Sequence, residues 1–171
     1  SGLPRHDSVW YNSPLTREQM VERLRHLEPS REFRTTYQYQ NLMFVTAGYL
    51  AGKVAGSSWE DLVRRRLFAP LGMKSSNFAV ADSQKAPDYA LPYRRVKDQV
   101  ELTDFRVIDE IGPAGSINSN VEDMIRYVAM YLNQGRHEGA QILSSATVQQ
   151  MMTPQMVIPG ALRWKENGHQ S

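Results

Sequence analysis

The sequence has no cysteine among its 171 residues. This absence excludes a disulfide framework, a thiolate metal site and a cysteine nucleophile. The sequence also has no apolar run that approaches the ~18 residues of a membrane-spanning helix, so we expect no membrane segment. Neither absence fixes the compartment in which the protein works.

The sequence also has no large excess of positive or of negative residues. Lys and Arg number 20 against 18 for Asp and Glu, which gives a net charge of +2. This balance gives no electrostatic reason to expect binding to nucleic acid. The run Arg64–Arg66 does not change that expectation, because neighbouring residues on a helix point in different directions. With 41% hydrophobic and 22% charged residues, the chain has the composition of a soluble domain that can bury a core.

The sequence also lacks motifs for metal binding, for nucleotide binding and for the nucleophile elbow of α/β-hydrolases. The histidines are scattered, with no i, i+4 pair and no HExxH. No GxGxxG or GxxxxGK[ST] is present to bind phosphate, and no GxSxG is present. We therefore expect no metal and no cofactor. The four histidines are His6, His26, His137 and His169.

Helix-start signals recur along the chain. Thr16 opens a capping box with Gln19, and Ser119 opens another with Glu122. Apolar residues follow each start at helical spacing, and glycine or proline follows each expected end. These signals predict five helices, at about 17–28, 41–55, 59–69, 120–132 and 145–152.

The remaining segments predict little regular structure. Short alternating stretches within 93–108 predict a small β-hairpin, and 76–92 is predicted as loop. The GPAG stretch at 112–115 is predicted as a turn, and the polar tail, 159–171, completes no element. Strands and helices do not alternate as a parallel sheet requires. The chain is therefore predicted to be mainly α, with about five helices and a small β-hairpin.

Several short motifs follow one another in an informative order. The chain begins SGLPRHD and continues with Tyr39-Gln40-Asn41. LFAPLGM follows at 67–73, GPAGSINSNVEDMIRYVAMYLNQG at 112–135, and ILS at 142–144. This succession resembles the serine β-lactamase and penicillin-binding protein superfamily, and most of all the branch with class C β-lactamases, serine esterases and D-amino-acid peptidases. The resemblance implies a helical subdomain of the α/β β-lactamase/transpeptidase-like fold.

The resemblance gives two residues of the Y-x-N motif specific roles. It implies that Tyr39 takes part in moving the proton of a nucleophilic serine, since a serine hydroxyl is a poor nucleophile on its own. It implies that Asn41 donates its side-chain amide to a carbonyl of a small-molecule or peptide-like substrate. Without the resemblance, a tyrosine in front of a helix is more often a packing contact. An asparagine at that place is more often a helix cap.

Two other family motifs are missing from the sequence. No serine has a lysine three residues on, since Ser83-Gln84-Lys85 has the wrong spacing, and no K-T-G occurs. His137-Glu138-Gly139 spells the H-x-G variant, but at a place where the family has a surface connection. We therefore expect 1–171 to be one helical subdomain that lies between the S-x-x-K helix and the K-T-G or H-x-G strand, and to be inactive by itself.

Further expectations concern contacts and location. Segments 1–12 and 76–110 are candidates for substrate contacts, with His6, Trp10 and Tyr11 as specific but weaker candidates. The family resemblance favours a periplasmic or secreted protein. Apolar helix faces that the fold leaves uncovered are expected to support a homo-oligomer. The expected faces contain Leu42, Val45 and Leu50, or Met124, Ile125 and Val128.

One alternative from another class stays open at this point. The missing nucleophile also fits a helical binding or interaction module that performs no chemistry. The intact Y-x-N motif favours the hydrolase.

Overall fold

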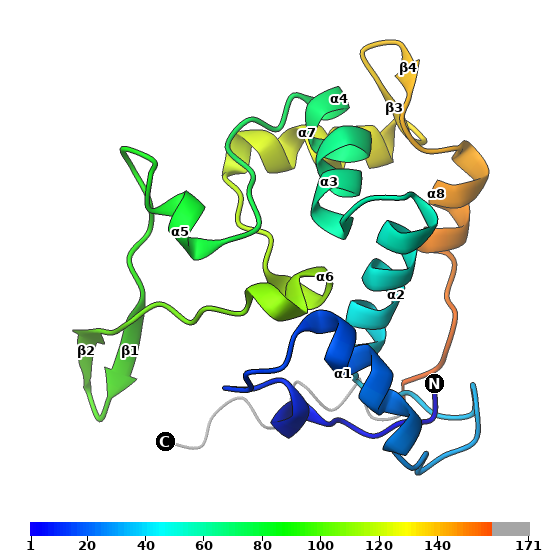
Figure 1. Ribbon diagram of the computed structural model, residues 1–171. Helices are drawn as coiled ribbons and strands as arrows, with labels where there is room; N and C mark the ends of the chain where they lie inside the picture. Colours follow the sequence, from blue (N-terminus) through cyan, green and yellow to red (C-terminus); the bar gives the residue numbers. More distant parts are fainter. Residues whose placement is uncertain (159–171) are drawn as a thin grey trace.

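Helices make up most of the regular structure in the computed structural model, which describes residues 1–158 (Figure 1). The polar tail predicted for 159–171, with His169, lies outside the described residues. The predicted mainly α architecture with a small hairpin is confirmed for the described part. The longer helices are α1 (Arg17–Arg23), α2 (Asn41–Val54), α7 (Val121–Leu132) and α8 (Ser145–Met152).

The third predicted helix is a composite of three segments. Helix α3 (Trp59–Val63) continues through a π-helical turn (Arg64–Phe68) into α4 (Ala69–Leu71). Gly72 ends the run with a left-handed backbone, φ +66°. The remaining elements are short: 3-10 turns Asp7–Val9, Leu24–His26 and Asp109–Ile111; helices α5 (Val80–Ser83) and α6 (Gly112–Gly115); strands β1 (Tyr93–Val96), β2 (Gln99–Leu102), β3 (Arg136–His137) and β4 (Ala140–Gln141).

Side-chain caps fix most of the helix starts as predicted. Thr16 and Gln19 form the reciprocal capping box of α1, and Ser58 accepts from the Asp61 amide at 3.0 Å. The prediction for α7 was wrong by one residue. Its N-cap is Asn120, which accepts from the Asp123 amide at 2.9 Å, and not Ser119.

A buried contact explains why α7 begins at this residue. Asp123 is almost fully buried, and its carboxylate accepts from the Ser75 amide and the Ser76 hydroxyl, both at 2.8 Å. The Ser119 hydroxyl lies 2.8 Å from that of Ser76. A tertiary contact therefore decides between two neighbouring residues that are both good caps.

The structure differs from the predictions at five other places. Helix α1 gives way to a 3-10 turn after Arg23. The predicted loop 76–92 contains α5, the GPAG turn is one helical turn, and β3 pairs with β4 in an unpredicted second hairpin. The stretch 105–107 is not a strand. These elements are so short that sequence periodicity carries little signal for them.

Two hydrophobic clusters hold the helices together. One joins α1 and α2 to the 3-10 turn before α6, and the other joins the α3–α4 run to α7. In the second cluster, the Phe68 and Phe78 rings stack with centroids 5.0 Å apart. The buried members are Met20, Leu42, Val45 and Ile111 in the first cluster, and Phe68, Leu71, Met73, Phe78 and Met130 in the second.

Helices α2 and α6 approach closely at a glycine. A Cβ placed on Gly48 would lie 2.3 Å from Cγ of Pro113 and 2.4 Å from its Cβ. No side chain fits there without moving the proline ring. Gly48 therefore lets the GPAG turn of α6 rest against the middle of α2.

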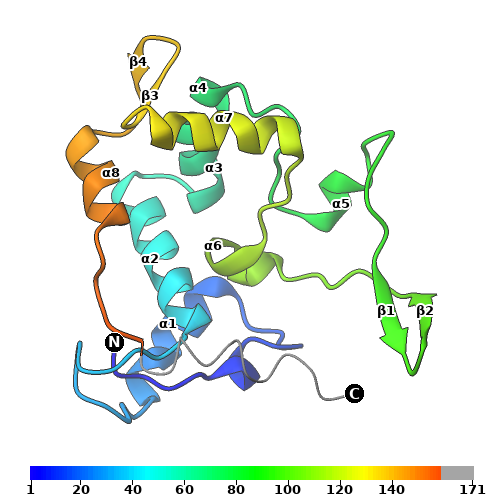
Figure 2. The same cartoon turned by 180° about the vertical axis from the view of Figure 1, so that it is seen from behind.

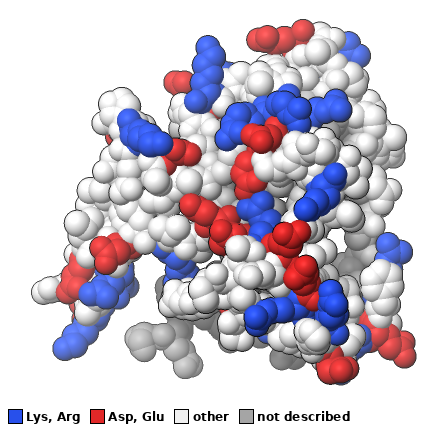
Figure 3. All heavy atoms as spheres, viewed as in Figure 1, with Lys and Arg blue, Asp and Glu red and all other residues white. Residues whose placement is uncertain are grey.

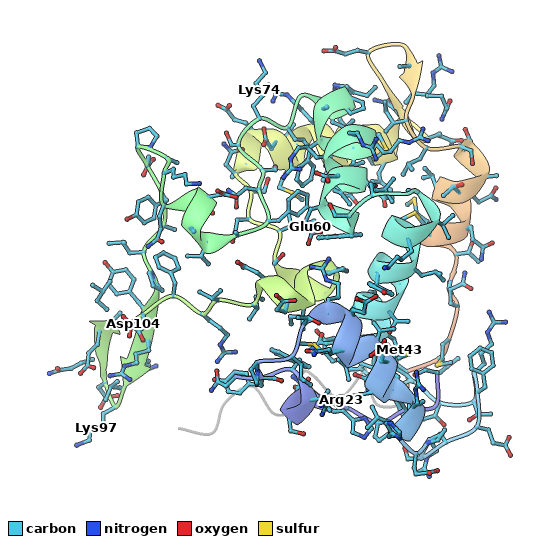
Figure 4. All side chains as sticks on the ribbon, in the orientation of Figure 1. Arg23, Met43, Glu60, Lys74, Lys97 and Asp104 are labelled. Atoms are coloured by element: carbon cyan, nitrogen blue, oxygen red, sulfur yellow. The ribbon has the colours of Figure 1, made fainter. Side chains whose placement is uncertain are left out.

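An ion pair joins α1 to α3 where both meet α6. The Arg17 guanidinium donates to both carboxylate oxygens of Glu60, at 2.6 and 3.1 Å, and also to the backbone carbonyls of Asp109 and Glu110. Glu60 lies at the end of α3 that faces α6 (Figure 4). Burial alone would raise the pKa of Glu60, but the hydrogen bonds and charge of Arg17 outweigh it and hold that pKa below its usual value.

The segment around β1 and β2 projects from the helical body as an arm (Figures 1 and 2). The strands pair antiparallel, with Tyr93 opposite Leu102 and Val96 opposite Gln99. Every residue of both strands is exposed. The ribbon is thus held mainly by its own pairing.

Helix α7 exposes an apolar face on the outside of the molecule, with α3 behind it (Figure 2). The expectation for α2 was only partly right, because Leu42 and Val45 are buried in the core and Leu50 alone is exposed. The exposed residues of α7 recur at i, i+4, i+7 and i+11, so they lie on one side of the helix. They are Val121, Ile125, Val128 and Leu132, with Met124 beside them.

Candidate active site

The Y-x-N residues lie where an extended strand of chain enters α2. Gln40 has an extended backbone, φ −149° and ψ 103°, and its side chain caps the helix by accepting from the Leu42 amide at 3.1 Å. Asn41 is the first helical residue. Asn41 is therefore not the N-cap, and its side chain is available for another contact.

Tyr39 is a surface residue at this point of the fold. Its side chain is 49% exposed, so it is not a core packing contact. The guanidinium carbon of Arg5 lies 5.1 Å from the centroid of the ring, within the range of a cation–π contact. The phenol is thus presented at the surface beside a fixed positive charge.

Asn41 is only 7% exposed, and its amide is held by a carboxylate. Its Nδ2 donates to Oδ1 of Asp7 at 3.3 Å. The same oxygen accepts from Nε1 of Trp10 at 3.0 Å. The other oxygen, Oδ2, accepts from Nε of Arg5 in a close ion pair. Asp7 therefore gathers three donors around the start of α2.

The N-terminal segment follows the motif along its length. Nε2 of Gln40 donates to the carbonyl of Pro4 and lies 3.4 Å from Nδ1 of His6. Of the weaker candidates, His6 and Trp10 are thus brought to the motif. Arg5 and Asp7 were not singled out from the sequence. The one feature of the sequence that could have pointed to them is their position, directly after the SGLP motif.

Tyr11 lies in a different place. It borders a cavity of about 100 Å³ between residues 10–13 and 106–111. Its hydroxyl lies 3.3 Å from a guanidinium nitrogen of Arg106, whose carbon is 4.9 Å from the ring centroid. The two segments expected to contact substrate, 1–12 and 76–110, thus meet at this small cavity.

A wider groove of about 590 Å³ lies between α1, α2 and α3. The Tyr49 hydroxyl and the Lys53 ammonium both donate to Glu18 there, the latter at 3.3 Å. Because these donors stabilise the carboxylate, the pKa of Glu18 is lowered. The hydrogen bond to Glu18 raises the pKa of Tyr49, and contacts with Tyr49 and then Glu18 raise the pKa of Lys53. All three groups are at the surface, so this is a solvated network.

The H-x-G stretch is separate from the motif. His137 ends strand β3, and Glu138-Gly139 forms the turn of the β3–β4 hairpin, where Gly139 has φ +83°. Within residues 1–158, no three His, Asp or Glu side chains are grouped to hold a metal ion. The described helices include none that is long and apolar enough to cross a membrane. Basic and acidic side chains are mixed over the face drawn in Figure 3.

Comparison with known proteins gives consistent matches along the chain. The family model described as Beta-lactamase matches residues 1–169. The unguisins hydrolase ungD' of Aspergillus campestris is 28% identical over 166 residues, which cover 93% of this chain and 30% of that protein. The unguisins hydrolase ungD of Aspergillus violaceofuscus is 32% identical over 143 residues, or 78% of this chain and 25% of that protein. The chain thus spans less than a third of the length of these relatives.

Solved structures share the fold. The octameric penicillin-binding protein homologue from Pyrococcus abyssi superposes with a TM-score of 0.76 at 24% identity, over 92% of this chain and 37% of that chain. The D-amino acid amidase from Ochrobactrum anthropi SV3 superposes with a TM-score of 0.63 at 22% identity, over 86% of this chain and 44% of that chain. At these identities the likeness establishes a common fold only.

Proposed function

Because this chain belongs to the beta-lactamase family, we propose that it forms part of a serine hydrolase that cleaves an amide, ester or β-lactam bond through an acyl-enzyme. Hydrolysis is supported by the family and by relatives that are themselves hydrolases. The observation that carries the proposal is the placement of the Y-x-N motif. Tyr39 is exposed beside a cation, and Asn41 is freed from capping and held by Asp7.

In this proposal Tyr39 moves protons. A serine hydroxyl must lose its proton as it attacks a carbonyl, and the leaving group must gain one. A phenol can do both when it stands at the surface of the cleft near positive charge. Tyr39 has that exposure, and the Arg5 guanidinium lies over its ring.

Asn41 has the proposed role of binding the substrate next to the scissile bond. Its position at the first turn of α2 is rigid, because the helix and Asp7 hold it from two sides. A side-chain amide offers both a donor and an acceptor. A substrate with a secondary amide matches both, and a β-lactam or ester carbonyl matches the donor.

The nucleophile is proposed to come from another part of the same protein. No serine of this chain has a lysine three residues on, so the chain supplies one wall of the cleft as a helical subdomain, with Tyr39 and Asn41. The alternative, a helical module without chemistry, is favoured by this missing motif alone. The two functions make different predictions for the same substitutions.

The test is made in the full-length protein that contains this chain. Tyr39→Phe keeps the ring and removes only the hydroxyl of an exposed side chain, so thermal stability should change little. Turnover should fall by about 10²- to 10⁴-fold, the usual loss when a proton-transfer group is removed. Asn41→Ala should act mainly on KM if Asn41 holds the substrate.

A matched control is Tyr37→Phe, two residues away and 45% exposed. It removes the same hydroxyl from a similar surface position and should leave turnover unchanged. Full activity of Tyr39→Phe, with hydrolysis still present, would show that Tyr39 has no part in the chemistry. Absence of any hydrolase activity in the folded full-length protein would favour the non-catalytic module.

A further inference from the structure

An ion pair that belongs to neither motif residue contacts both of them. Arg5 lies over the ring of Tyr39, and Asp7 accepts from the side chain of Asn41. Arg5 and Asp7 are joined by a close ion pair in which Nε of Arg5 donates to Oδ2 of Asp7. The two partners therefore connect the two residues of the motif from one side.

The chemistry of a carboxylate fixes how Asn41 is turned. An ionised carboxylate has acceptors only, so it can pair with the nitrogen of an asparagine amide but not with its oxygen. Asp7 therefore holds Nδ2 of Asn41, and Oδ1 of Asn41 is directed to the other side of the amide group. One N–H remains for a substrate carbonyl, and Oδ1 remains for a substrate or enzyme N–H.

Asp7 is itself held firmly in place. Trp10 Nε1 donates to Oδ1 at 3.0 Å, and Arg5 binds Oδ2. The Asp7 side chain is 30% exposed, compared with 96% for Asp98 in the hairpin turn. A carboxylate that two donors hold in fixed directions can set the orientation of a third group that depends on it.

We propose that Asp7, fixed by Arg5 and Trp10, is a positioning residue that sets the amide orientation of Asn41 for substrate binding. The inference rests on the proposed function, because it assigns Asp7 a role in the same site. Asp7 itself touches no reacting atom in this scheme. Its whole effect on catalysis is expected to pass through Asn41.

A double-mutant cycle in the full-length hydrolase tests this directly. Asp7→Asn keeps the size of the side chain but presents a donor as well as an acceptor, so Asn41 is no longer held in one orientation. We expect kcat/KM to fall about tenfold, mainly through KM. In the Asn41→Ala background the same substitution should have almost no further effect.

Two further variants separate positioning from general structure. Asp61→Asn removes the same charge from the exposed surface of α3, where Asp61 pairs with Arg64 at 2.7 Å, and should leave kcat/KM unchanged. Trp10→Phe removes the other donor to Oδ1 together with part of a ring that packs against the first hydrophobic cluster. It should lower thermal stability and also raise KM, and only the effect on KM should disappear in the Asn41→Ala background.

Arg5→Gln provides a second route if Asp7→Asn lowers the yield of folded protein. Arg5 is exposed, so its replacement should be tolerated. The replacement removes the donor to Oδ2 of Asp7, so the carboxylate is held less firmly. We expect an effect on KM of about threefold that disappears in the Asn41→Ala background, and a loss in kcat that persists there, because the cation over the Tyr39 ring is removed as well.

The outcomes are distinct. Asp7→Asn could lower kcat/KM equally in the unmodified protein and in the Asn41→Ala background. That result would show that Asp7 acts through the fold, and it would overturn the positioning role. Asn41→Ala could lower kcat/KM while Asp7→Asn leaves it unchanged. That result would also overturn the positioning role, but it would leave the proposed function intact. If Asn41→Ala and Tyr39→Phe are both as active as the unmodified protein, the proposed function itself fails, and the role of Asp7 with it.

Discussion

Replacing Gly48 by alanine should destabilise the protein, although alanine is the better helix former. Gly48 lies inside α2, where exchange of glycine for alanine usually gains about 1 kcal/mol. Here the new Cβ would lie 2.3 Å from Cγ of Pro113. A pyrrolidine ring cannot rotate away, so α6 must move from α2.

The expected size follows from these opposing effects. Forcing an extra methyl group into a packed contact costs about 1–3 kcal/mol. Real Cβ atoms essentially never lie this close to another heavy atom, so we take the upper part of that range. After the gain in helix propensity, the net loss is about 1–2 kcal/mol. For a chain of this size, that lowers Tm by roughly 2–8 °C.

Gly115→Ala is the matched control. Gly115 also lies in a helical turn, but the nearest atom to an added Cβ is Cδ1 of Ile108 at 4.0 Å. This substitution should raise Tm slightly. Thermal and urea unfolding of the three proteins, followed by circular dichroism, measure the difference.

Two results would refute this reasoning. Gly48→Ala could be as stable as the parent protein, which would mean that α6 does not rest on α2 at this point. The effect of Gly48→Ala could also be unchanged when Pro113 is replaced by glycine. If the ring is the obstacle, the two substitutions together should cost less than the sum of each alone.

The remaining predictions concern chemistry, acid stability and association. The pure 171-residue chain should not be labelled by a fluorescent penicillin or a fluorophosphonate probe, and stoichiometric site-specific labelling would contradict the assignment of the nucleophile to another part of the protein. Because the pKa of Glu60 is lowered in the folded state, its pair with Arg17 stabilises the protein above the ordinary pKa of 4.5, and this stabilisation is lost as pH falls through the lowered pKa. Glu60→Gln should therefore lower Tm at pH 7 and make little difference near pH 3. The exposed apolar face of α7 should make the isolated chain self-associate, and light scattering should show a return to monomer for Ile125→Glu combined with Val128→Glu; a parent chain that is already monomeric at high concentration would contradict this.

Much of the fold could be predicted because the signals are local. The capping box of Thr16 and Gln19 and the glycine after α2 each act within one helical turn, so the sequence contains both the signal and its target. The Y-x-N motif also appeared at the expected place, at the start of a helix. Local chemistry and local position were sufficient for these elements.

The π-helical turn shows why a helical period alone was not sufficient. A regular helix continuing from Trp59 was predicted here. The widened turn adds one residue, and Phe68 and Leu71 are then fully buried while Leu67 is half-buried against the same cluster. Packing against Phe78 and against Met130 of α7 supports this arrangement.

The site was predicted less completely than the fold. The motif named Tyr39 and Asn41 as candidates, which stays a prediction, but Arg5 and Asp7 lie more than thirty residues away in the sequence. Only the folded chain brings their charges to the start of α2. Charged residues outside a recognised motif are usually solvated, so their types gave no reason to select them.

The arm formed by β1 and β2 also gives the protein a place for experimental modification. Lys97 stands at its tip (Figure 4), in a two-residue connection where it adopts φ 55°. Because the cost of closing a loop grows only slowly with its length, a peptide tag inserted after Lys97 would lengthen an exposed turn without entering either hydrophobic cluster. The protein could then be labelled or immobilised through its arm, which projects away from α2 in both views (Figures 1 and 2).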